Sequence, residues 1–171
     1  DFPLWLRKIL FWTFFKTQSK TYGKSSLDVA KLRELGYLQL SSKRLEKKTC
    51  ASILDFLSTC SGREKISSQG TVLKKTYDQQ SLLHNEIIVD LATDRDVLQL
   101  ASDYFGSQPK IPYLASWTTF ADDESEVGDM SFHMDHHGHK FLKLFYYLTP
   151  VSENSGHHEY IAKTTDQLVH G

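Results

Sequence analysis

The spacing of apolar residues along the chain changes near residue 110. Before that point they recur at intervals of three and four, as on one face of a helix. The segments predicted as helices are 27–35, 42–57, 82–91 and 93–105. The short segment 37–40 alternates like a strand, and the mostly polar stretch 61–80 is expected to hold one strand around 71–77. Residues 27–110 are therefore expected to form a mainly helical support region.

Capping signals mark the ends of these helices. Thr93 stands at an N-cap position, with Asp96 placed as its capping-box partner. Gly106 is suited to end the same helix, and Gly36 to end the first one. Ser42 is expected to cap the helix that carries Cys50.

From residue 111 the period becomes two, which is typical of strands. The predicted strands are 111–121, 130–135, 140–149 and 157–163, with an acidic loop over 122–129. Helices first and strands later is an α+β order, suited to helices laid on a β-barrel-like pair of sheets. The chain is expected to form a single domain, with 111–171 as the first part of its β core.

Residues 1–26 combine an apolar run with a polar linker. The run 2–15 is rich in Trp and Phe, but it is short and carries Arg7 and Lys8, so it does not form a transmembrane segment. We expect a helix that packs on its own domain. The alternative is an interfacial helix that makes peripheral membrane contact.

Composition narrows the classes of function. With 171 residues, 40% of them hydrophobic, the chain can bury one core. A formal charge of -1 gives no global field to attract nucleic acid. Cys50 and Cys60 are expected to be free thiols, as in a reducing, cytoplasmic compartment.

The candidate chemistry centres on His133-Met134-Asp135. Positions i and i+2 of a strand point to one face, so the imidazole and the carboxylate would share one space. With a further histidine they would form the facial triad that binds iron(II) and leaves positions open for a co-substrate and oxygen. A His-x-Asp pair is also common by chance, and a histidine-rich turn such as 136–139 is often only a solvated loop.

These residues, with KFLKLFYYLTPV at 140–151 and ENSGHHEYI at 153–161, resemble the phytanoyl-CoA dioxygenase family. The close similarity covers residues 111 to 163. It implies a double-stranded β-helix, a jelly-roll or cupin-like fold, with the N-terminal helices packed on the sheet. It also implies a non-haem oxygenase that uses Fe(II), 2-oxoglutarate and O2 to hydroxylate a small-molecule substrate. His133 and Asp135 would be its metal ligands.

Two further site residues are candidates. Lys143, with Phe145 at an alternate position, would pair with the distal carboxylate of 2-oxoglutarate if its face is the inner one, and would reach to water if it is the outer one. Family members more often use an arginine after the last metal histidine, and no such residue matches here. His170 is the sole histidine after His158 and would be the third ligand if intervening residues are missing. The chain is thus expected to be part of a longer enzyme or to have lost its last ligand.

Other functions stay open beside the oxygenase. The rim of the site is expected to carry His136, His137 and His139. His158 matches a histidine often seen in relatives, where it would have a structural role or would orient a metal ligand without binding the metal itself. A catalytically inactive double-stranded β-helix binding module that lacks the distal ligand is the first alternative. A zinc-dependent hydrolase that uses the histidine cluster is the second.

Overall fold

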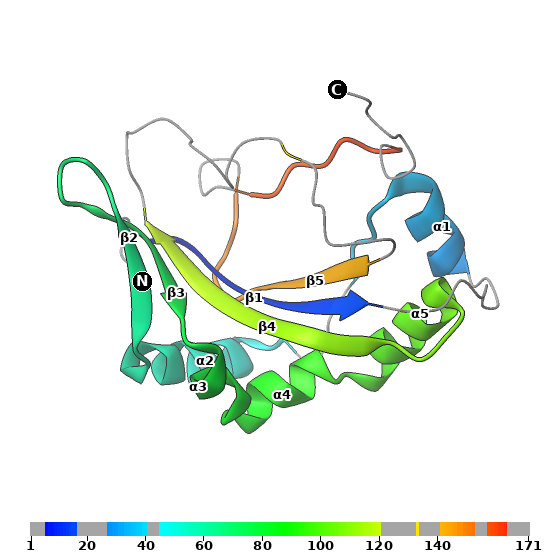
Figure 1. The fold of residues 1–171 in the computed structure, drawn as a ribbon, viewed down its shortest axis with the longest axis horizontal. Coiled ribbons are helices and arrows are strands. Elements are labelled where there is room, and N and C mark those ends of the chain that lie inside the picture. The colour runs from blue at the N-terminus through cyan, green and yellow to red at the C-terminus, as the bar shows by residue number, and fades with distance from the viewer. Residues whose placement is uncertain are drawn as a thin grey trace.

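The structure is a computed structural model that describes residues 6–16, 27–40, 45–120, 133, 141–152 and 157–163. The fold is α+β, with one antiparallel sheet whose lower face in Figure 1 is covered by helices. The strands are β1 (Leu6–Lys16), β2 (Gly62–Ile66), β3 (Val72–Tyr77), β4 (Lys110–Phe120) and β5 (Phe141–Tyr147). The helices are α1 (Leu27–Leu35), α2 (Lys47–Thr59), α3 (Gln79–Leu83), α4 (Glu86–Ala92) and α5 (Arg95–Phe105).

The first strand of the chain lies inside the sheet. The strand order is β2-β3-β4-β1-β5, and every neighbouring pair is antiparallel. Trp12 of β1 is in register with Ala115 of β4 on one side and with Phe145 of β5 on the other. The sheet therefore forms only when residues far apart in the sequence come together.

The helix predicted within residues 1–26 is wrong for 6–16, which form β1. Periodicity alone does not separate a short apolar run of a buried strand from a buried helix. A strand with neighbours on both edges is often apolar throughout, and the Trp, Phe, Ile and Thr residues of this run favour a strand. The interfacial helix proposed as its alternative is wrong for the same residues.

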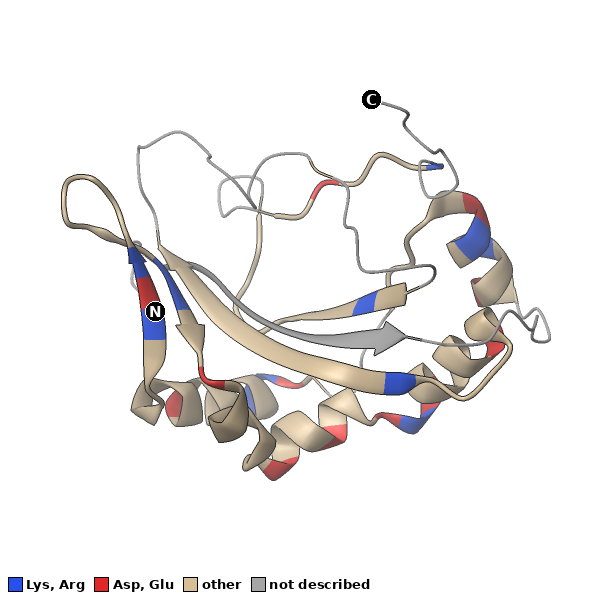
Figure 2. Ribbon diagram, viewed as in Figure 1, with Lys and Arg blue, Asp and Glu red and all other residues tan. Residues whose placement is uncertain are grey.

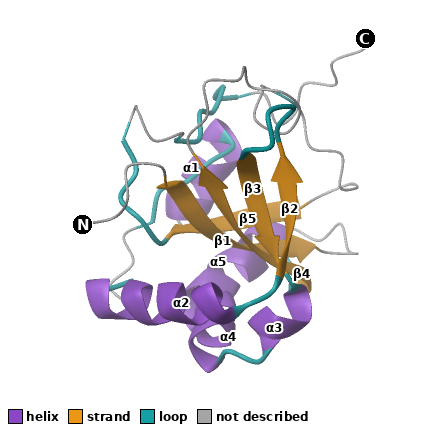
Figure 3. Ribbon diagram, turned by 90° about the vertical axis from the view of Figure 1, so that its left-hand side faces the viewer, coloured by secondary structure: helices purple, strands orange, loops and turns teal. Residues whose placement is uncertain are grey.

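The core lies between the sheet and the helices (Figure 3). Its largest fully buried side chains outside the sheet include Ile53, Leu57, Leu82, Ile88 and Phe105. Two tyrosines place hydroxyls in this layer. Tyr77 Oη and Thr118 Oγ1 are hydrogen-bonded at 2.8 Å, and Tyr146 donates to the Leu91 carbonyl at 3.1 Å. These bonds satisfy polar groups that burial would otherwise leave unpaired.

The predicted ends of α1 and α5 are confirmed. Gly36 and Gly106 follow these helices with φ of 83° and 72°, a left-handed conformation that glycine adopts without a steric penalty. The predicted cap of α5 is wrong by one residue. Asp94, not Thr93, accepts the N–H groups of Asp96 and Val97, at 2.8 and 3.2 Å.

Other predicted boundaries also moved. The α2 helix begins at Lys47 with Glu46 as N-cap, so a cap at Ser42 is wrong. A single helix over 82–91 is wrong, because α3 ends at Leu83 and α4 begins at Glu86. Asn85 between them is the N-cap of α4, and its side chain accepts the Ile88 N–H at 3.1 Å. The strand expected near 71–77 is confirmed as β3, and it pairs with β2, a strand that the sequence pattern did not predict.

No described helix has the length and apolar character needed to cross a membrane.

The segments 37–40 and 157–163 are not strands. The second segment packs instead against the end of α1 (Figure 1). The Lys163 N–H donates to the Leu35 carbonyl at 3.1 Å, and the rings of Tyr37 and Tyr160 lie 5.7 Å apart. The structure thus shows a helix-backed antiparallel sheet with an added C-terminal segment.

Candidate functional site

The two faces of β5 have different surroundings. Leu142, Leu144 and Tyr146 pack on the helix side, where they join the two hydrophobic clusters of the core. Side chains alternate along a strand, so Phe141, Lys143, Phe145 and Tyr147 point to the opposite side. We call this opposite side the open face of the sheet, because α2 to α5 leave it uncovered (Figure 1).

Lys143 is half-buried on the open face. Its strand pairs with β1, where Phe14 is its register partner. The aromatic neighbour Phe145 lies on the same face, with its ring centroid 4.5 Å from that of His158. A lysine beside aromatic rings carries a charge at a partly desolvated position, which favours pairing with an anion.

His158 lies close to the open face through contacts with β5. Its Nδ1 is hydrogen-bonded to the hydroxyl of Tyr147, and its backbone N–H donates to the same oxygen at 3.2 Å. Burial raises the pKa of Tyr147, and the hydrogen bond from the His158 backbone partly opposes that rise. The phenol therefore stays neutral at physiological pH. The neighbouring His157 contacts a different residue: its Nε2 lies 3.2 Å from a carboxylate oxygen of Glu159.

The predicted metal ligands are only partly described. His133 is exposed and is not in a strand, whereas Asp135 and His170 lie outside the described residues, as does most of the strand predicted over 130–135. Among the described residues there is no group of three His, Cys, Asp or Glu side chains that could hold a metal ion. The rim histidines His136, His137 and His139 also lie outside the described part of the chain.

The donor types of this candidate set suit iron(II). Two imidazoles and one carboxylate are the donors of the facial triad, and the set contains no thiolate of the kind that structural zinc sites recruit. The two cysteines stand apart from the motif, and both are free thiols, as predicted. Burial raises the pKa of Cys50 and of Cys60, which keeps both thiols protonated near neutral pH.

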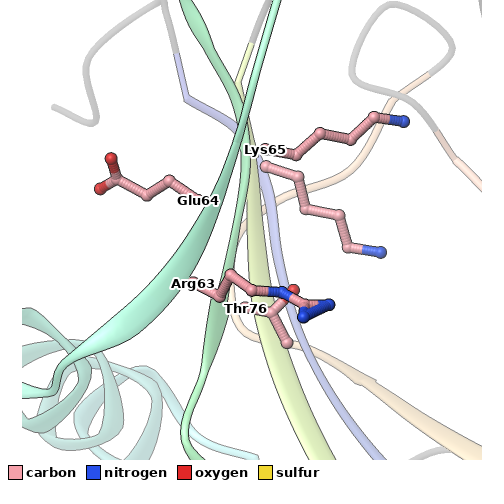
Figure 4. A pocket seen from close by; sticks show the side chains of 5 residues that line it. Arg63, Glu64, Lys65 and Thr76 are labelled. Atoms are coloured by element: carbon pink, nitrogen blue, oxygen red, sulfur yellow. The ribbon is translucent and has the colours of Figure 1, made fainter.

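A second group of charged side chains lies on the β2–β3 hairpin, where Figure 2 shows basic residues at its strands. A shallow cleft of about 210 Å³ is lined there by Arg63, Glu64, Lys65, Lys74 and Thr76. Figure 4 shows Arg63 and Lys65 on one side of the strand and Glu64 on the other. The acidic residues of α4 and α5 lie in the helix layer instead (Figure 2).

This hairpin cluster is not predicted from the sequence, because the mostly polar residues 61–80 indicate only a single strand. The signal was present in the spacing. Arg63 and Lys65 are two residues apart, as are Lys74 and Thr76, which places each pair on one face of a strand. Recognising β2 as a strand was the step that the pattern did not support, because all five of its residues are exposed.

Comparisons of the chain with protein-family models, with curated proteins and with solved structures give no match.

Proposed function

We propose that the chain is an Fe(II)- and 2-oxoglutarate-dependent dioxygenase that hydroxylates a small organic substrate. The observation that carries the proposal is the position of Lys143. It follows the His133-x-Asp135 motif on the next described strand and lies on the open face of the sheet. A double-stranded β-helix would place its second sheet over that face, and this closure is part of the proposal.

The proposal gives each candidate residue one role. His133 and Asp135 would hold the metal together with His170 or another later histidine. The metal, once bound, supplies the activation of oxygen that no amino-acid side chain provides. The ammonium of Lys143 would pair with the distal carboxylate of 2-oxoglutarate, and Phe145 beside it would lower the local dielectric and strengthen that pairing.

The direct test is conversion of 2-oxoglutarate to succinate by the chain with added iron(II). We expect turnover that is lost in His133→Ala and in Asp135→Ala. The matched control is His157→Ala, which removes an exposed histidine paired with Glu159 outside the motif. Full turnover in His133→Ala would overturn the assignment.

Lys143 is tested by the concentration dependence of the same reaction. Lys143→Ala should raise the KM for 2-oxoglutarate by about tenfold or more, because one charge-assisted hydrogen bond is lost. Lys143→Arg keeps the positive charge and should recover part of the affinity. The control is Lys163→Ala, since Lys163 is an exposed lysine 3.7 Å from Glu34 on α1. An unchanged KM in Lys143→Ala would remove Lys143 from the site.

The same assays separate the alternatives. A binding module would bind 2-oxoglutarate without forming succinate, and that binding would still depend on Lys143. A zinc hydrolase would be purified with zinc when no metal is added, which metal analysis would detect.

A further inference from the structure

The cleft on the β2–β3 hairpin has a concentrated positive charge. We call it the cationic cleft and define it by Arg63, Lys65, Lys74 and Thr76. Arg63 and Lys65 are exposed, and Lys74 and Thr76 are half-buried. The remaining lining residue is Glu64, whose side chain points to the other side of β2 in Figure 4. Both strands are wholly described, and neither adds a carboxylate to the cleft side.

The strand register brings like charges together. Lys65 is directly opposite Lys74, and Arg63 is directly opposite Thr76. Directly opposed side chains of an antiparallel pair are close neighbours, so two lysines there repel each other and destabilise the pair. An anion bound between them would offset this repulsion. The arrangement is therefore one that a bound anion stabilises.

Lys74 is held in place from the neighbouring strand. Its Nζ lies 4.8 Å from the ring centroid of Trp117 on β4, at a distance where a cation is attracted to the aromatic face. Trp117 is in register with Thr76, so the ring adjoins the cleft on the same face of the sheet. One wall of the cleft is thus ordered before any ligand binds, which lowers the entropic cost of binding.

We propose that the cationic cleft binds the phosphate group of a small phosphorylated ligand. Arginine offers a planar fork that matches two phosphate oxygens, lysines add point charges, and the Thr76 hydroxyl can donate a further hydrogen bond. The cleft of about 210 Å³ is smaller than the roughly 300–1,000 Å³ of pockets that enclose a whole ligand. It therefore takes the anionic head group, while the rest of the ligand lies outside.

The test is calorimetric titration of the chain with pyrophosphate at low ionic strength and without metal. We expect saturable binding to one site, weakened about tenfold or more in Lys65→Gln because a charge-assisted contact is lost. Arg63→Lys should also weaken binding, since it keeps the charge but removes the fork. The matched control is Lys48→Gln, at an exposed lysine of α2 in the helix layer.

A second readout uses Trp117 as a reporter. Pyrophosphate should change the tryptophan fluorescence of the chain, and this change should be lost in Trp117→Phe, which keeps an aromatic ring beside Lys74. Absence of saturable binding, equal loss in Lys48→Gln, or equal affinity for acetate would each overturn the proposal. Because the titration contains no iron and no 2-oxoglutarate, its outcome is independent of the oxygenase assignment.

Discussion

Tyr147 and His158 are joined by two hydrogen bonds that use one oxygen. The hydroxyl of Tyr147 is bonded to His158 Nδ1 and also accepts the His158 backbone N–H at 3.2 Å. At the other end of the same segment, the Lys163 N–H donates to the Leu35 carbonyl at 3.1 Å. Residues 157–163 are thus attached at one end to the open face of the sheet and at the other end to α1.

Removing the Tyr147 hydroxyl should loosen this segment. Tyr147→Phe keeps the ring and its packing but deletes both hydrogen bonds, so we expect a loss of about 1 kcal/mol of unfolding free energy. Amide hydrogen exchange should increase over residues 157–160, because their attachment to β5 is weakened. Urea unfolding and hydrogen-exchange mass spectrometry measure the two effects.

The neighbouring tyrosine provides the contrast. Tyr146→Phe removes a hydrogen bond in the helix layer, and the Leu91 carbonyl still accepts the Asp94 N–H at 3.5 Å, so its cost should also be about 1 kcal/mol. It should leave exchange in 157–160 at its original rate, since that segment contacts the other face. Equal exchange in the two variants would contradict the assignment of the faces of β5.

Stability should fall in alkaline solution. Burial raises the pKa of Tyr77 above its ordinary value of 10.0 and that of Cys60 above 9.0. The folded state then keeps protons that the unfolded state releases, so the slope of unfolding free energy against pH is negative in this range. The stabilisation is complete below pH 9 and is lost as the pH rises through the raised folded-state pKa values.

The variant Tyr77→Phe isolates one part of this decline. It deletes the hydrogen bond to Thr118 and so lowers stability at neutral pH, but it should flatten the curve above pH 10. Denaturant unfolding at a series of pH values measures both changes. A wild-type stability that rises above pH 9 would show that the sign is wrong.

The opposed lysines of the cationic cleft predict a stabilising substitution. Lys65→Glu replaces a like-charge pair with a cross-strand ion pair to Lys74, which should add about 0.2–1 kcal/mol at low salt. Lys65→Gln removes only the repulsion and should fall between the wild type and Lys65→Glu. The differences in stability between the variants should shrink at high salt, because Lys65 is exposed and Lys74 is half-buried, so dissolved ions screen their charges. Thermal unfolding at two ionic strengths tests this order.

Local signals in the sequence were sufficient for part of the fold. Gly36 and Gly106 ended helices where predicted, because a left-handed residue after a helix is a local requirement that glycine meets. The strand at residues 6–16 was not predicted because its local pattern, a short apolar run, fits a buried helix as well as a buried strand. β1 is a strand through its pairing with β4 and β5, which are distant in sequence.

The candidate site shows the same division. The alternation of Lys143, Phe145 and Tyr147 follows from sequence alone, but the sequence left open which face was the helix side. In the structure Leu142 and Leu144 pack against the core, so their face of β5 is the helix side. The strand predicted over 130–135 is wrong at His133, which is not in a strand, whereas the prediction that His133 and Asp135 bind one metal stays a prediction, since Asp135 lies outside the described residues.

The N-cap of α5 gives a test in which sequence and structure name different residues. In the structure the carboxylate of Asp94 is buried and accepts the N–H groups of Asp96 and Val97, whereas the Thr93 hydroxyl donates to the Val89 carbonyl at 2.8 Å. Asp94→Ala should therefore cost about 1 kcal/mol, because two N–H groups at the helix start lose their acceptor. Thr93→Ala should change stability by no more than about 0.5 kcal/mol, because Thr93 is exposed and its hydroxyl donates to the Val89 carbonyl, whereas the backbone N–H that caps α4 is kept. Urea unfolding of both variants measures the two losses of unfolding free energy. A greater loss in Thr93→Ala than in Asp94→Ala would show that Thr93 is the N-cap.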